Sequence, residues 1–112
     1  MTTMTEDELL TGLTDAMTLS GWWWMHVRRS DQAIIQGMQG FPDIFAVHPT
    51  RRQALAWELK SDKGQPTYEQ HAWMHAISLV VDGCPGVWDG RIVRPADYDA
   101  ALGFVLRGTW GA

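Results

Sequence analysis

The chain has 112 residues, 46% of them hydrophobic and 20% charged, which is typical of one folded globular domain and unlike a disordered chain. Its net charge of −4 excludes a protein that coats DNA through a general excess of Lys and Arg. The single Cys84 excludes an intrachain disulfide, and no apolar run is long enough for a membrane span or a secretory leader. We therefore expect one cytoplasmic domain, with its core at about 5–106.

The first predicted element is a helix that begins after Thr5. Thr5 and Glu8 have the spacing of a capping box, and apolar residues at helical spacing continue to Ser20-Gly21. In that register Glu6 shares the apolar side and faces the sheet, whereas Glu8 points away. An acidic residue at this position also complements the helix N-terminus, so both roles stay open for Glu6.

A strand is predicted at 22–28, with Trp23, Met25 and Val27 on one face and the intervening residues on the other. We expect both faces to be covered, which makes the three consecutive Trp residues part of the core and of the surface that packs against helices. The alternative is that exposed aromatic side chains near Arg28 and Arg29 stack on bases. The segment 30–40 that follows has no clear period but contains Ile34, Ile35 and Met38. Apolar residues in a loop indicate a covering partner, either a second protomer or a DNA groove.

Two further strands, 43–47 and 54–60, are predicted to pair in the middle of the sheet. In the second strand Leu55, Trp57 and Leu59 share one face, and Glu58 and Lys60 share the other. Pairing brings Asp43, Glu58 and Lys60 together at one edge of the sheet. A hard divalent cation bound by the carboxylates would compensate their burial. The alternative is that Glu58 and Lys60 lie on a solvated face and Asp43 caps a turn.

The next helix is predicted from Thr67, which forms a second capping-box pattern with Gln70, to Asp82-Gly83. Gln70 is also in phase with the apolar side of this helix, so it caps the helix, faces the sheet beside Lys60, or takes the two roles in different states. Asp89-Gly90 predicts a hairpin turn between short strands at 86–88 and 91–93. Pro95 suits the first turn of a last helix, at 96–106.

These motifs resemble the PD-(D/E)XK nuclease superfamily, and within it the small VRR-NUC and phage Holliday-junction-resolvase-like endonucleases. The resemblance rests on Gly-Phe-Pro-Asp at 40–43, Glu-Leu-Lys at 58–60 and Gln70, and it covers the chain from about Thr5 to Tyr98. It implies an α/β fold with a restriction-endonuclease-like core, in which helices flank a central mixed sheet in the order α-β-β-β-α-β-α.

The resemblance also implies hydrolysis of DNA phosphodiester bonds with Mg²⁺ or Mn²⁺. The catalytic residues would be Asp43, Glu58, Lys60 and Gln70. The metal ligands would be Asp43, Glu58, the Leu59 carbonyl and, from the first helix, Glu6. His26 either lines this site or is a hydrogen-bonded structural histidine.

DNA, in particular branched DNA, is the expected substrate, and a homodimer would supply the paired cuts that a four-way junction requires. A dimer surface is also indicated by apolar side chains that exceed what one small core can bury: Trp22, Trp24, Ile34, Ile35, Met38 and Trp110. We expect neither an organic cofactor nor a membrane partner, and a location in the host cytoplasm if the protein is phage-encoded. The candidate DNA contacts are Arg28, Arg29, Arg51, Arg52 and Lys63. The alternatives are a nicking or flap nuclease of the same fold, and a non-catalytic DNA-binding or interaction module that retains the fold.

Overall fold

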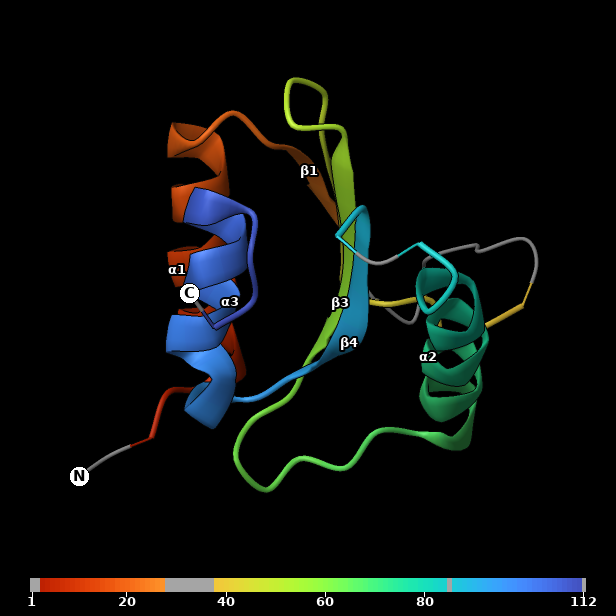
Figure 1. Ribbon diagram of the computed structural model, residues 1–112. Helices are drawn as coiled ribbons and strands as arrows, with labels where there is room; N and C mark the ends of the chain where they lie inside the picture. The colour runs from red at the N-terminus through yellow and green to blue at the C-terminus, as the bar shows by residue number, and fades with distance from the viewer. Residues whose placement is uncertain (1–2, 28–37, 85, 112) are drawn as a thin grey trace.

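The computed structural model describes residues 3–27, 38–84 and 86–111. Its elements are α1 (Glu6–Leu19), β1 (Trp23–His26), β2 (Ile44–His48), β3 (Gln53–Leu59), α2 (Tyr68–Val81), β4 (Trp88–Val93), the short 3-10 helix η1 (Pro95–Asp97) and α3 (Tyr98–Arg107). Helices α1 and α3 lie on one face of the sheet and α2 lies on the other (Figure 1). The predicted order of helices and strands is therefore confirmed. Among the described residues, no helix combines the length and the apolar character that crossing a membrane requires.

The four strands form one mixed sheet in the order β1-β2-β3-β4. The β1–β2 and β2–β3 pairs are antiparallel, and β3 pairs with β4 in parallel. The strands after Asp43 and before Lys60 are thus the two inner strands, as predicted. The α/β class with a mixed sheet is established, and the finer assignment to a restriction-endonuclease-like core remains a prediction.

The predicted alternation of β3 is confirmed by the packing on its two sides. Leu55, Trp57 and Leu59 are buried in the core beneath α1 and α3. The other face of β3 carries Glu58 and Ala56, and Ala56 lines an apolar cavity of about 310 Å³ between the sheet and α2. The alternate residues of β3 therefore belong to two faces of the sheet. We call the face under α1 and α3 the closed face, and the opposite face the α2 face.

Both helix starts predicted from capping boxes are confirmed. In α1 the Glu8 amide donates to Thr5 Oγ1 at 3.1 Å, and the Thr5 amide donates to Glu8 Oε1 at 3.0 Å. In α2 the Gln70 amide donates to Thr67 Oγ1 at 3.2 Å, and the Thr67 amide donates to Gln70 Oε1 at 2.8 Å. Each box satisfies two amides for which the helix itself supplies no partner.

The predicted hairpin turn at Asp89-Gly90 is wrong. Both residues lie inside the single strand β4, which runs parallel to β3. A Cβ atom on Gly90 would collide with Ile77 Cγ2 of α2. Gly90 is therefore required because α2 approaches the strand closely there, which is a second physical reason for a glycine within a strand pattern.

The prediction that both faces of the first strand are covered is also wrong. Trp22, which precedes β1, is only 4% exposed, but Trp23, Trp24 and Met25 are 72%, 41% and 55% exposed. The strand lies at the edge of the sheet, and α2 packs mainly against β4 at the opposite edge. The α2 face is consequently open over β1.

Candidate active site

The candidate catalytic residues meet where β2 begins and β3 ends. Asp43 immediately precedes β2, and its Oδ2 accepts a hydrogen bond from the Leu59 amide at 2.8 Å. Ile44 pairs with Trp57, so continuing the antiparallel register by one residue places Asp43 beside Glu58. Both residues then belong to the α2 face, because their neighbours Ile44 and Trp57 point into the closed core.

Glu58 is fully buried, whereas Asp43 and Lys60 are partly exposed. Burying an ionised carboxylate costs free energy unless nearby charge or hydrogen bonds compensate it. Lys60 directly follows β3, and its amide still donates to the Val93 carbonyl oxygen of β4 at 3.0 Å. The strand geometry therefore continues, and Lys60 has the same side-chain direction as Glu58 two residues before it. The arrangement therefore combines a buried acid, a solvent-accessible acid and an amine at one end of the α2 face.

Gln70 is buried in the first turn of α2, where its Oε1 accepts the Thr67 amide of the capping box. The capping role left open by the sequence is thus realised. Gly40 brings this turn close to Asp43: its φ is +101°, and an added Cβ would lie 2.5 Å from the Glu69 carbonyl group. Only glycine allows the chain before Asp43 to pass so near α2.

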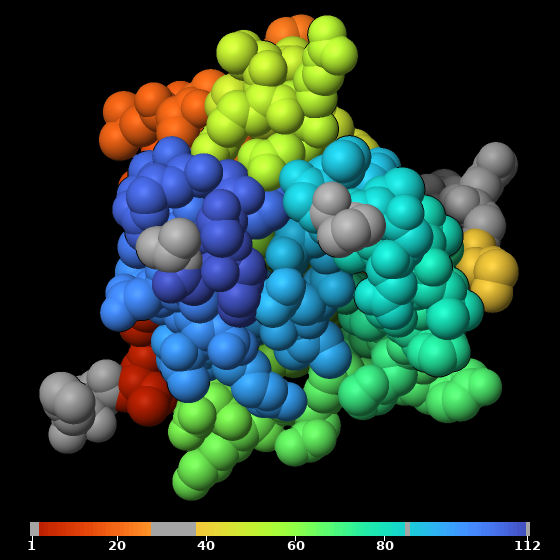
Figure 2. Space-filling model, viewed as in Figure 1, coloured from red at the N-terminus to blue at the C-terminus, as the bar shows by residue number. Residues whose placement is uncertain are grey.

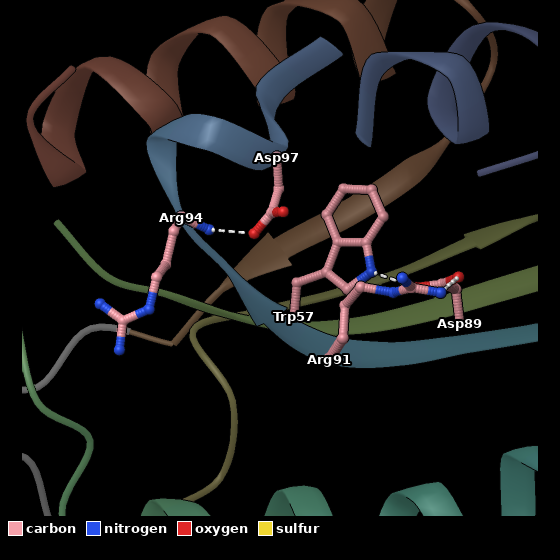
Figure 3. Close-up of polar contacts among 5 residues, drawn as sticks. All are labelled: Trp57, Asp89, Arg91, Arg94 and Asp97. Carbon is pink, nitrogen blue, oxygen red and sulfur yellow. Dashed lines mark hydrogen bonds and ion pairs between the residues drawn. The ribbon is translucent and has the colours of Figure 1, made fainter. Parts of the chain in front are cut away.

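Arg94 holds the loop that follows Lys60, and the sequence did not identify this role. Its Nη1 donates to the carbonyl oxygens of Ser61 at 2.9 Å and of Gly64 at 2.8 Å, and its amide donates to Asp97 Oδ2 at 3.0 Å. Figure 3 shows the guanidinium extending away from the Asp97 contact. The Arg-x-x-Asp spacing signals the local cap, but the loop carbonyls are distant in sequence.

No family model, no curated protein and no solved structure matches the chain.

Glu6 lies apart from the acidic pair. It is exposed in the first turn of α1 and lines, with Ser61, an open polar depression of about 440 Å³. The prediction that Glu6 faces the sheet is therefore wrong. The buried positions of α1 begin only at Leu9, and α1 packs on the closed face, opposite Glu58. The first turn lies beside Ser61, beyond the last residue of β3.

The donor set at this end of the sheet suits a hard cation. Within the described ranges, no three His, Cys, Asp or Glu side chains form a group that could hold a metal ion. Two carboxylates, from Asp43 and Glu58, and the Leu59 carbonyl remain. All are hard oxygen donors of the kind that Mg²⁺ binds together with several water molecules. The residues therefore fit Mg²⁺ chemically, without Glu6.

His26 belongs to the other face of the sheet. It pairs with Ile44, and cross-strand partners in an antiparallel pair point the same way. Ile44 is buried in the closed core, so the imidazole lies on the side of α1 and α3. The alternative in which His26 lines the acidic pair is therefore wrong.

The candidate DNA contacts fall at two ends of the molecule. Arg51 and Arg52 occupy the β2–β3 turn, about 17 Å along β2 from Asp43. Lys63 is exposed in the loop after Lys60. This loop, in green, lies at the end of the molecule opposite the β2–β3 turn, in yellow-green (Figure 2). Arg28 and Arg29 lie outside the described residues.

Arg51 serves the fold. Its Nη2 donates to the Val105 carbonyl oxygen at 2.6 Å, and its guanidinium lies 5.3 Å from the Trp22 ring centroid. Burial lowers the pKa of Arg51 from its ordinary value. Arg51 therefore ties the β2–β3 turn to the C-terminal end of α3, whereas Arg52 is exposed.

Proposed function

We propose that this protein is a metal-dependent DNA endonuclease that hydrolyses phosphodiester bonds. The observation that carries the proposal is the strand register that sets Asp43 beside buried Glu58, with Lys60 next on the same face. A module that only binds DNA has no physical need for clustered acids where a phosphate would approach. The resemblance of the three segments to PD-(D/E)XK nucleases supports the same conclusion.

Each residue has a distinct role in this proposal. Asp43, Glu58 and the Leu59 carbonyl would hold Mg²⁺ or Mn²⁺, which supplies an activated water molecule and neutralises charge on the phosphate. The Lys60 ammonium would orient the water or stabilise the developing negative charge. Gln70 Oε1 is engaged by Thr67, so the amide nitrogen of Gln70 is the group that would help position Lys60 or the water.

Arg94 would act as a positioning residue for Lys60. It fixes the carbonyl groups of the 61–64 loop, and a Cβ atom on Gly64 would lie 3.5 Å from Lys60 Cδ. The Lys60 side chain therefore extends from the end of β3 past this loop, which restricts its conformation. We infer that the loop limits the directions the Lys60 amine can take.

A homodimer and a branched substrate remain part of the proposal, but the dimer surface needs revision. Trp22 is buried and Trp110 is partly buried, so neither indicates an uncovered interface, and Ile34 and Ile35 lie outside the described residues. Of the predicted surface, Trp24 and Met38 are exposed. Further large apolar side chains are exposed on α2 and extend the surface there: Tyr68, Leu79 and Val80. Sedimentation at micromolar concentration, alone and with junction DNA, tests this; a monomer in both cases contradicts it.

The decisive assay compares cleavage of branched, nicked, flapped and linear DNA, with Mg²⁺ and with EDTA. We expect Mg²⁺-dependent cutting that Asp43→Asn and Glu58→Gln each abolish while the protein stays folded. Glu69→Gln is the matched control, because Glu69 is an exposed acid in the first turn of α2. Cutting in EDTA, or normal rates in both site variants, contradicts the proposal. The preferred substrate separates junction resolution from nicking or flap cutting.

A non-catalytic DNA-binding or interaction module that retains the fold is the second candidate. The acidic net charge of −4 fits a module whose contacts do not depend on neutralising many phosphates. It predicts DNA binding in EDTA with no cutting of any substrate in Mg²⁺. The acidic pair would then be dispensable for DNA affinity. Binding by Asp43→Asn that equals wild type, together with inactive wild-type protein, selects this candidate.

A further inference from the structure

An apolar strip runs along the open part of the α2 face and leads to the acidic pair. It consists of Trp23 and Met25 on β1 and their partners Val47 and Phe45 on β2. These side chains share a face, since cross-strand partners point the same way and alternate residues along a strand do too. Trp23 is 72% exposed and Met25 is 55% exposed, and both partners are partly buried.

The strip is aligned with the candidate site. Phe45 is two residues from Asp43 along β2, or about 7 Å, and Val47 is two residues further. Trp23 and Met25 are also about 7 Å apart along β1. A polymer lying along the strands would therefore place successive flat groups over Trp23 and Met25 as its backbone reaches Asp43.

Charge at the two ends of the strip favours a polyanion as the occupant. Exposed Arg52 lies beyond the Trp23–Val47 pair, in the β2–β3 turn, and Lys60 with exposed Lys63 lies beyond Asp43. The described strip itself contains no acidic side chain. If two copies paired through this strip in antiparallel, two-fold fashion, Arg52 of one copy would lie near Lys60 and Lys63 of the other. That like-charge arrangement disfavours a second copy of the chain.

We propose that the strip binds the unpaired bases of single-stranded DNA next to the phosphate to be cut. Bases stack on exposed aromatic side chains without sequence preference, and paired bases inside a duplex do not offer their faces in this way. The inference rests on the proposed nuclease function, and it gives a physical basis for preferring branched or flapped DNA. Trp23 contributes the main stacking surface, and Met25 provides an apolar contact.

The test measures binding of fluorescein-labelled oligo-dT by anisotropy, in EDTA and low salt, so that no cutting occurs. Trp23→Ala should weaken oligo-dT binding about fivefold or more, and Trp23→Phe should retain most of the affinity. Trp24→Ala is the matched control, because Trp24 points to the opposite face and its Nε1 donates to Thr18 Oγ1 of α1. It should change the affinity by less than about twofold. Affinity for blunt duplex DNA should be unchanged in all variants.

Three results overturn the inference: no binding of oligo-dT by wild type, equal losses in the two alanine variants, or a dimer that dissociates in Trp23→Ala. The last result assigns the strip to a protomer interface. A different result contradicts the proposed function alone. If oligo-dT binding depends on Trp23 but the protein cuts no DNA in Mg²⁺, the nuclease proposal is wrong and the DNA-binding role of the strip stands. If the protein cuts DNA equally well with Trp23→Ala and its oligo-dT binding does not depend on Trp23, the nuclease proposal stands and the role of the strip is wrong.

Discussion

The two faces of the sheet are covered by different elements, although both faces are formed by alternate residues of the same strands. On the closed face Leu55 and Trp57 are fully buried under α1 and α3. On the α2 face a helix covers one edge, Trp23 stays exposed at the other, and a buried acid lies between them. The closed face therefore provides stability, and the α2 face is the side on which the proposal places the DNA.

A polar cluster completes the closed face. The Trp57 indole nitrogen donates to Asp89 Oδ1 at 2.8 Å, and Arg91 forms a two-point contact with the same carboxylate at 2.7 and 2.8 Å (Figure 3). The Arg91 guanidinium lies 3.6 Å from the centroid of the Trp110 ring. Asp89 is thus neutralised within the fold.

The largest expected effect comes from removing Trp57. Trp57→Ala should lower the free energy of unfolding by about 3–5 kcal/mol, because it leaves a cavity and removes a donor to Asp89. Trp23→Ala on the open face should change the same quantity by about 0.5 kcal/mol or less. Urea unfolding followed by circular dichroism measures both. Similar losses would mean that the two faces do not differ in their contribution to stability.

A smaller effect is expected where α2 meets the sheet. Gly90→Ala should cost about 1–3 kcal/mol, since the added methyl group displaces Ile77 and with it the helix. Gly83→Ala, just after α2, is the control: an added Cβ there meets only the Val80 carbonyl, at 3.4 Å. Denaturant unfolding of the pair should separate them clearly. Equal stability would show that α2 is not held closely against β4.

The smallest effect concerns the start of α1. Hydrogen bonds from the Thr5 backbone and side chain lower the pKa of Glu8 below its usual 4.5. A lowered pKa in the folded state gives stability that is present above the unfolded pKa and is lost as pH falls through the folded one. Thr5→Ala should cost about 1 kcal/mol at neutral pH. It should raise the Glu8 pKa only part of the way toward 4.5, because the backbone amide at position 5, the larger cause of the lowering, remains.

An NMR titration of Glu8 and unfolding at neutral pH test this prediction together. Thr11→Ala is the control, because Thr11 is exposed in the second turn of α1 and does not cap the helix. A Glu8 pKa at its ordinary 4.5 in the unmodified protein would show that the capping box does not form in solution.

The order of elements was predictable because its signals are local. Capping pairs begin both long helices, and the alternation of Leu55, Trp57 and Leu59 against Glu58 fixes the faces of β3. Sequence patterns whose meaning depends on which elements pack nearby in space gave wrong predictions. A glycine that suits a turn equally suits a strand under a close helix, as at Gly90, and a run of Trp residues does not reveal that β1 lies at an edge.

The candidate site was predictable in part for the same reason. Asp43, Glu58 and Lys60 follow from strand pairing, which sequence alternation indicates. Glu6 was misplaced because helix phase gives a direction but not where the sheet ends beneath the helix. Arg51 is held by the Val105 carbonyl and Arg94 by the carbonyls of a loop 30 or more residues away, and such long-range pairs leave no periodic trace in one sequence.

The central claim, that the α2 face holds the metal at the Asp43–Glu58 pair, is tested most directly by adding Mn²⁺ to the isotope-labelled protein. Paramagnetic broadening of backbone amide signals should appear first around Asp43 and Ile44 and around Glu58 to Lys60, and Asp43→Asn should abolish it. Broadening confined to Glu6 and Ser61, or none at millimolar Mn²⁺, would contradict the account.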